Sequence, residues 1–218
     1  MTRAALNRRL GFAAAIAVLA VLAYANSLGG DFVWDDRPLI LQSPTVHSAS
    51  NLGAIFSGDF FSHSQNPLPY GYYRPITTLS FVLDWWVWRD DPTGFHITNI
   101  ALHAIASILV LFLLLRLGLD EALSLTIAAV FAVHPIHTEN VTWISGRTDV
   151  LAFVFAAGAL LLDLYARDGA PKADSPKKKR RKNRKNREGP PPTYPSPRTT
   201  RPFLVALAVV SFAAAMLA

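Results

Sequence analysis

The chain has 218 residues, of which 51% are apolar, no cysteine, and a formal net charge of +6. The apolar residues come in blocks, which is typical of membrane spans and argues against one soluble core. The lack of cysteine excludes disulfide bonds and thiolate metal sites.

Positive and negative charges are concentrated in two different segments. Residues 26–95 contain seven aspartates and three arginines, whereas residues 167–201 contain thirteen lysines and arginines and three acidic residues. Because lysine and arginine near span ends mark the cytoplasmic side, we expect the basic segment and the N-terminus to be cytoplasmic. The segment 26–95 then lies outside, in the periplasm or in a lumen.

The first predicted span lies within residues 1–25, where an apolar run follows Arg3, Arg8 and Arg9. Residues 23–25 also have the small-x-small pattern of a signal-peptidase site, so a cleaved signal peptide is an alternative to a retained span. In both cases the next segment reaches the outer side.

The outer loop, residues 26–95, carries an acidic motif and an apolar stretch. The stretch covers residues 76–88, and its 13 residues are fewer than the roughly 20 that a span requires. Its three tryptophans, at positions 85, 86 and 88, suit a helix that lies at the membrane surface. We therefore predict an interfacial helix.

Residues 96–166 are predicted to hold three spans, and a short outer loop with two histidines, at residues 134–149, precedes the last of them. The three spans cover 96–116, 122–136 and 150–166. Since only helices and closed barrels satisfy the backbone inside lipid, the predicted fold class is an all-α integral membrane protein. It is a multi-span helical bundle whose outer loop carries interfacial helices.

The segment 167–202 is basic and rich in proline. This composition buries too little apolar surface to fold, so we expect a disordered cytoplasmic loop that contacts anionic lipid. A nuclear signal or an RNA-binding tract has the same composition in soluble proteins, but between membrane spans we predict no nucleic-acid partner. Residues 203–218 are apolar to the last residue, and we expect a truncated span from a longer protein.

Two adjacent carboxylates, Asp35 and Asp36, follow the first span closely. A carboxylate within hydrogen-bond reach of an acceptor hydroxyl can remove its proton while a bond forms. The pair is therefore a candidate general base at the membrane exit. The alternative from charge alone is a solvated acidic turn.

The outer histidine loop contains His134, His137 and Glu139, followed by Arg147. Two imidazoles and a carboxylate are candidate ligands for a divalent metal. The alternative is a hydrogen-bonded loop that binds phosphate or caps helices, because Pro135 interrupts a regular helix there.

Two further polar groups lie at or inside the membrane boundary. Arg74, at the start of the interfacial helix, is suited to bidentate phosphate binding or to anchoring at the interface. His96, Asn99 and His103 share one helix face, and polar residues in a span face a bundle interior or a wet cavity. They are candidates for a substrate cavity or for hydrogen-bonded helix packing.

Six motifs follow one another along the chain. They are NSLGGDFVWDD at 26–36, YRPI at 73–76, GFHITN at 94–99, LH at 102–103, FAVHPIHTE at 131–139 and GRTD at 146–149. Taken together and in this order, they resemble the N-terminal part of the transmembrane and tetratricopeptide-repeat (TMTC) family of O-mannosyltransferases, which belongs to the GT-C superfamily. Any one motif alone would not be specific.

The resemblance implies a GT-C-type bundle that moves a sugar, mannose-like, from a polyprenyl-phosphate donor to a hydroxyl of an exported protein or a glycan. It implies that Asp35 or Asp36 is the base and that the donor phosphate, alone or with a divalent metal, is held by arginines and histidines. Trp34 would pack on the sugar or the prenyl chain. The alternatives are a non-catalytic membrane scaffold and an ion carrier that uses His96 and His103. The implied phosphate-binding residues are Arg74, His134, His137 and Arg147.

Overall fold

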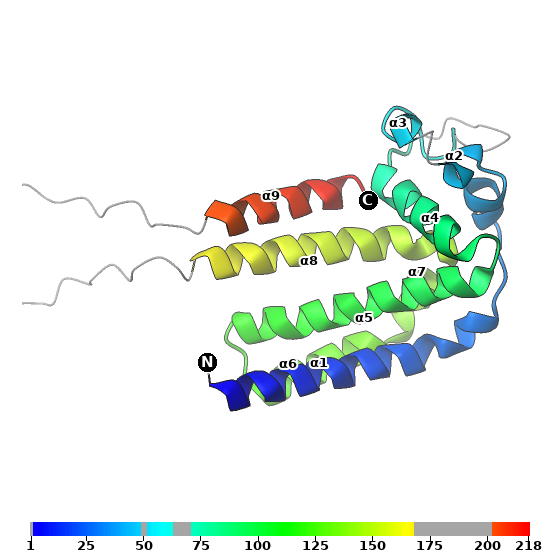
Figure 1. Cartoon of the computed structure of the whole chain (residues 1–218). Coiled ribbons are helices and arrows are strands. Elements are labelled where there is room, and N and C mark those ends of the chain that lie inside the picture. The colour runs from blue at the N-terminus through cyan, green and yellow to red at the C-terminus, as the bar shows by residue number, and fades with distance from the viewer. Residues whose placement is uncertain (1, 49–51, 63–70, 168–201) are drawn as a thin grey trace, which may run out of the picture.

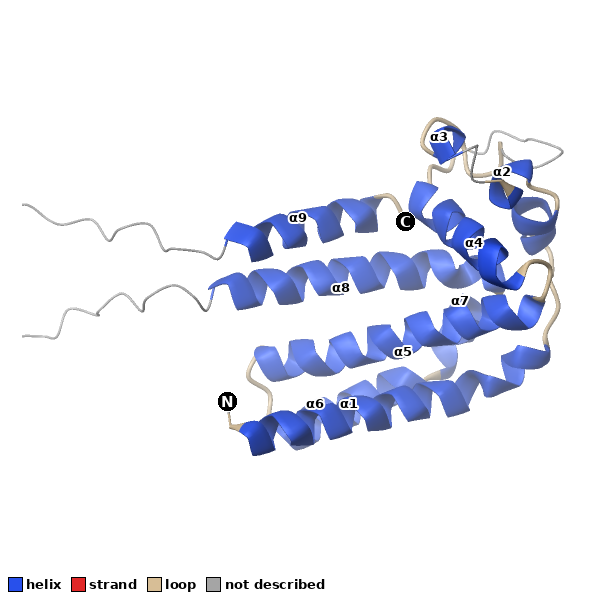
Figure 2. Cartoon of the chain, in the orientation of Figure 1, coloured by secondary structure: helices blue, strands red, loops and turns tan. Residues whose placement is uncertain are grey.

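The computed structural model describes residues 2–48, 52–62, 71–167 and 202–218. Every regular element among them is helical, as Figure 2 shows, so the predicted all-α class is confirmed. Five helices lie side by side, and shorter ones gather at one end, around the start of α8 (Figure 1). The five are α1 (Arg3–Tyr24), α5 (Pro92–Arg116), α6 (Glu121–Val133), α8 (Arg147–Arg167) and α9 (Pro202–Met216).

Helix α5 is central, because it packs against α1, α6 and α8, while α9 packs against α8. The contacts of α5 with α1 and α6 bury small and aliphatic side chains such as Ala20, Ala104 and Ala128. Small residues let helix backbones approach closely where lipid gives no hydrophobic drive for association.

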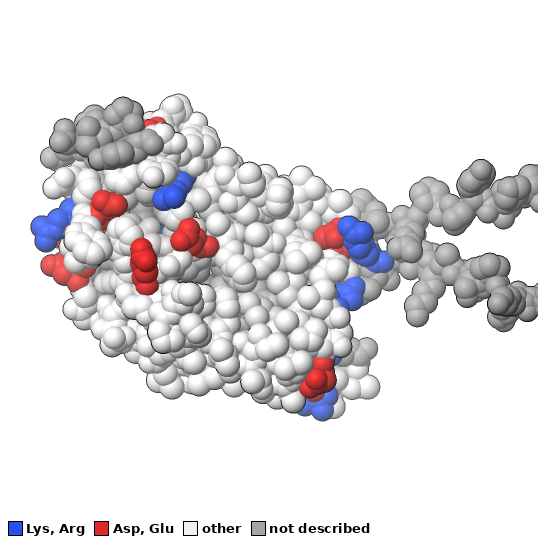
Figure 3. Space-filling view, turned by 180° about the vertical axis from the view of Figure 1, so that it is seen from behind, with Lys and Arg blue, Asp and Glu red and all other residues white. Residues whose placement is uncertain are grey.

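Within the described part of the chain, three helices are long and apolar enough to cross a membrane, and they contain α1, α5 and α8. On the face shown in Figure 3, charged side chains gather at the two ends of the molecule, and the surface between them is uncharged. The chain is therefore an integral membrane protein. Which end faces the cytoplasm stays a prediction.

Helices α6 and α9 are apolar but shorter than a typical span. Helix α6 begins where the sequence predicts, since the Asp120 carboxylate accepts the backbone N–H of Leu123 at 3.0 Å and Glu121 occupies the first turn. It ends at Val133 and not at residue 136, because His134 has an extended backbone and Pro135 follows.

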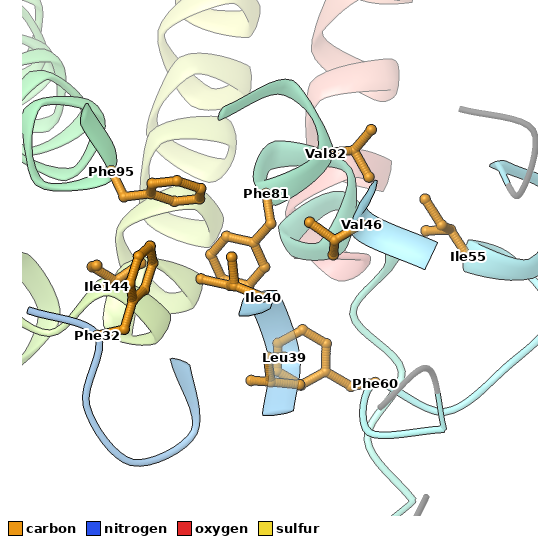
Figure 4. Packing of buried hydrophobic residues seen from close by; sticks show 10 residues of the cluster. All are labelled: Phe32, Leu39, Ile40, Val46, Ile55, Phe60, Phe81, Val82, Phe95 and Ile144. Atoms are coloured by element: carbon orange, nitrogen blue, oxygen red, sulfur yellow. The ribbon is translucent and has the colours of Figure 1, made fainter. Parts of the chain in front are cut away.

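The outer loop forms its own apolar core over the N-terminal end of α5. Helix α4 (Pro75–Trp88) contributes Phe81 and Val82, and the short helices α2 (Pro44–His47) and α3 (Leu52–Ile55) pack beside it. Figure 4 shows ten side chains of this core pointing toward one another. They are Phe32, Leu39, Ile40, Val46, Ile55, Phe60, Phe81, Val82, Phe95 and Ile144.

Helix α4 is the helix predicted at residues 76–88. One face is buried in the loop core, and the other exposes Leu83, Trp86 and Val87. An exposed apolar face at the outer end of the spans fits a helix at the membrane surface. The basic loop predicted to be disordered lies outside the described residues, except for Arg167, which ends α8, and Pro202, which begins α9.

Candidate functional site

Asp36 is completely buried and ties the outer loop to the start of α8. Its Oδ1 accepts the backbone N–H of Ser145 at 2.8 Å and the Ser145 hydroxyl at 2.5 Å, while its Oδ2 accepts the backbone N–H of Val33 at 3.0 Å. Burial raises the pKa of Asp36 above its usual range, and the three donors and the charge of Arg147 oppose that rise. Both carboxylate oxygens are occupied by the protein itself.

Asp35 differs from Asp36 both in its burial and in its hydrogen bonding. Its side chain is half-buried, and no described residue forms a hydrogen bond or an ion pair with its carboxylate. Of the two adjacent aspartates, Asp35 is therefore the one whose oxygens are open to a ligand.

Arg147, the first residue of α8, has no exposed surface. Its Nη1 donates to Asp84 Oδ2 at 2.5 Å, its Nη2 donates to the Phe95 carbonyl at 3.2 Å, and its guanidinium lies 4.8 Å from the centre of the Phe81 ring. Burial raises the pKa of Asp84, and the charge of Arg147 opposes that rise. We call Asp36, Asp84, Ser145 and Arg147 the buried joint.

His96, Asn99 and His103, the residues of α5 predicted to share one polar face, are all buried. Asn99 donates its amide N–H groups to the carbonyls of Val141, Trp143 and Ile144 at 3.0–3.3 Å, so it holds the loop before α8. His103 Nε2 lies 3.0 Å from the Ala132 carbonyl. Both residues serve helix packing in this arrangement.

His96 is also buried, and among the described residues neither ring nitrogen forms a hydrogen bond of good geometry, although the Gly30 backbone lies close enough to interact with the ring. Its ring lies against Gly30, where an added Cβ would come within 2.8 Å of Nε2. The glycine thus allows the outer loop to close over the histidine.

A cleft of about 200 Å³ lies among α5, α6, α7 (Thr138–Thr142) and α8. Its walls include Phe131 and Phe153, whose stacked rings are 5.6 Å apart. Asn140 donates to Asp149 Oδ2 at 2.9 Å. The cleft is thus apolar in one part and polar in another, and its lining comprises His103, Ala106, Phe131, His137, Asn140, Asp149, Val150 and Phe153.

His137 lines this cleft, and its ring centre lies 5.1 Å from that of His103 and 6.5 Å from that of His134. Burial lowers the pKa of His137, and the charge of His134 adds to that effect. Among the described residues, no three His, Asp or Glu side chains converge to hold a metal ion. The metal site predicted at His134, His137 and Glu139 does not fit this geometry, and no step below depends on it.

Two predicted residues lie at other places on the outer end. The Arg74 guanidinium lies over the rings of Phe60 and Tyr72, at 5.7 and 5.0 Å, and no contact joins it to the other candidates among the described residues. The Trp34 indole is 80% exposed and packs edge-to-face on Trp143. We call Trp34, Asp35 and Trp143 the aromatic rim.

Sequence reasoning missed two members of the buried joint, Asp84 and Ser145. A signal for Asp84 was present, since it is the one charged residue within the apolar stretch 76–88. A carboxylate in such a helix is rarely buried without a partner. Ser145 carries no comparable signal.

Comparison with known proteins gives sequence relatives only. No family model matches the chain. No solved structure matches it either.

The relatives are curated proteins of 35–38% identity. The chain is 35% identical over 156 residues to protein O-mannosyl-transferase F38B6.6 of Caenorhabditis elegans, 38% identical over 139 residues to protein O-mannosyl-transferase TMTC3 of Mus musculus, and 37% identical over 153 residues to protein O-mannosyl-transferase Tmtc1 of Drosophila melanogaster. These matches cover 63–69% of this chain but only 15–22% of the relatives' lengths. Over about two thirds of its length the chain is therefore similar to the TMTC family of protein O-mannosyl-transferases, as its motifs indicated.

Proposed function

We propose that this chain forms part of a membrane glycosyltransferase that moves mannose from a polyprenyl-phosphate donor to a hydroxyl of an exported protein. Support comes from the printed names of the relatives, protein O-mannosyl-transferases, and from membrane helices that end in a structured outer loop. The active face is the outer one, and the arginines near the start of α1 and the end of α8 mark the cytoplasmic side.

Asp35 is the general base, and the observation that carries this assignment is its contrast with Asp36. A base must come within hydrogen-bond reach of the acceptor hydroxyl. Asp36 is fully buried and already accepts three hydrogen bonds. Asp35 is half-buried and unpaired among the described residues.

The chemistry needs little more than a base and a place for the leaving phosphate. The acceptor oxygen attacks the anomeric carbon, the bond from that carbon to the phosphate oxygen breaks, and the hydroxyl proton passes to Asp35. Phosphate is a good leaving group, so hydrogen-bond donors near it suffice to stabilise the departing charge.

The phosphate is held at the histidine end of the cleft, near His134 and His137. The phenyl walls of Phe131 and Phe153 suit the first prenyl unit, and the imidazoles supply donors. The carboxylate of Asp149 would repel an anion, which places the phosphate toward the histidines. Arg74, half-buried on two aromatic rings, is a further candidate for contact with the phosphate.

Arg147 has a different part in this proposal. Its guanidinium is buried against Asp84 and Phe95, so it positions the loop before α8 and does not touch the donor.

The decisive test is Asp35→Asn in the full chain reconstituted in lipid. Removing a general base should lower transfer by roughly 10²–10⁴-fold while thermal stability stays unchanged. Asp31→Asn is the matched control, since Asp31 is exposed on the same loop, and it should retain transfer. Wild-type transfer by Asp35→Asn would refute the assignment.

A scaffold is the second candidate, because the polar residues Asp36, Asn99 and Arg147 act within the protein as structural groups. Titration with polyprenyl-phosphate mannose in nanodiscs separates the two candidates. A scaffold has no saturable donor binding, whereas the transferase shows it.

A further inference from the structure

Trp34 has a backbone conformation that is rare for a bulky residue. Its φ is +45°, in the left-handed region that favours glycine. Such conformations persist only when the surroundings enforce them, and they cluster at ligand sites. The indole that results from this strain is 80% exposed, so the strain does not serve burial of the ring.

The strained turn is fixed by the buried joint. Asp36 accepts the N–H of Val33 through its side chain and donates its own backbone N–H to the Val33 carbonyl at 2.9 Å. The same carboxylate binds Ser145 on the facing segment. Trp34 and Trp143 each stand two residues before one end of this link, so the link brings the two indoles together.

Trp143 is fixed through its backbone by Asn99 of α5. Its carbonyl accepts the Asn99 amide at 3.0 Å, and its ring meets Trp34 at 6.0 Å between centres and 82° between planes. Its buried Nε1 has no hydrogen-bond partner among the described residues. One ring is therefore fixed and half-buried, and the other stands against its edge with most of its surface free.

An open indole beside a free carboxylate matches the surface of a pyranose. The ring face carries negative charge density and attracts the polarised C–H groups of a sugar. The Asp35 carboxylate, next in the chain, accepts hydrogen bonds from hydroxyls. We propose that the aromatic rim binds the sugar ring of the donor, with Trp34 as the stacking face and Trp143 as its support.

This inference rests on the proposed function, and it adds which part of the donor the rim contacts. A membrane anchor is the competing explanation for an exposed tryptophan at the outer end. An anchor would bind lipid whether or not a sugar is attached. The two explanations therefore differ in a binding experiment that compares two lipids.

The test compares polyprenyl-phosphate mannose with bare polyprenyl phosphate, each titrated into nanodiscs that carry the full chain. The main variant is Trp34→Gly, because glycine adopts a positive φ without strain and the thermal midpoint should not fall. We expect the affinity for the mannosylated lipid to drop by about threefold to tenfold, the range for loss of an aromatic contact. The affinity for the bare lipid should stay unchanged.

Trp86→Ala is the matched control, since Trp86 is also exposed, on α4, and it should change neither affinity. Trp34→Phe should retain part of the preference for the mannosylated lipid. Equal losses for both lipids in Trp34→Gly would show an anchor and overturn the inference, as would no loss. A wild-type protein that binds neither lipid would overturn the proposed function together with this inference.

Discussion

The buried joint and the aromatic rim lie next to each other but use polar residues in opposite ways. In the joint, Asp36 and Arg147 have no exposed surface. The Asp36 carboxylate accepts hydrogen bonds from Ser145, and the Arg147 guanidinium forms an ion pair with Asp84. In the rim, Asp35 is unpaired among the described residues, and Trp34 is mostly exposed. The two adjacent aspartates therefore have different roles. Asp36 organises the loop through its hydrogen bonds, and the Asp35 carboxylate stays open to a ligand.

The largest effect should come from breaking the joint at its ion pair. Arg147→Ala leaves the Asp84 carboxylate buried without its ion-pair partner, with the Thr98 hydroxyl still donating to it at 2.8 Å, which costs about 3–5 kcal/mol of unfolding free energy. Arg74→Ala is the control, because that guanidinium is half-buried on aromatic rings, and it should cost about 1 kcal/mol or less. Thermal unfolding in nanodiscs measures the stability of both variants. Equal losses of stability in the two variants would contradict the structural role assigned to Arg147.

A smaller effect should follow from crowding the segment that carries Ser145. In Gly146→Ala the new Cβ would lie 2.6 Å from the Glu139 carbonyl oxygen, which costs about 1–3 kcal/mol through overpacking. Gly158→Ala, within the following helix α8, meets nothing within 4 Å and should stabilise that helix by about 0.5–1 kcal/mol. Chemical unfolding of the two variants measures these changes in unfolding free energy. An unchanged unfolding free energy in Gly146→Ala would mean that the segment around Ser145 can shift to accommodate the added methyl group.

The smallest effect should be a pH dependence from His137, which lines the cleft. Its folded pKa lies below the ordinary 6.5, so the unfolded chain takes up the proton first and the free energy of unfolding decreases as pH falls through about 6.5. His137→Asn should reduce this slope, while His103 and His134, which face His137, stay in both proteins. Thermal midpoints at about pH 7.5 and about pH 5.5 give the slopes. An unchanged slope would show that His137 is not buried in its neutral form.

The helices were predictable because their signals are local. Apolar length predicted α5 and α8, and the short tryptophan-rich stretch at 76–88 closely matches α4 (Pro75–Trp88). The differences lie at helix ends, where caps decide: α5 begins at Pro92 and not at residue 96, and α6 ends at Val133 and not at residue 136.

The site was predictable only as a set of residue types. The motifs identified Asp35, Asp36 and Arg147, but their different roles depend on contacts between segments far apart in the chain. Asp36 meets Ser145 across 109 positions, and Arg147 meets Asp84 across 63. No periodicity encodes such a pairing, so burial and partners had to come from the structure.

The pairing of Asp84 with Arg147 also sets an order of assembly. Helix α4 is synthesised 58 residues before α8 begins, and domains form during synthesis from the N-terminal side. A charged Asp84 is costly to bury alone, so we expect docking of α4 to become favourable once α8 supplies its arginine. We therefore expect the fold of the outer loop to be completed late, after α5, α6 and then α8 have been synthesised and α8 has entered the bilayer.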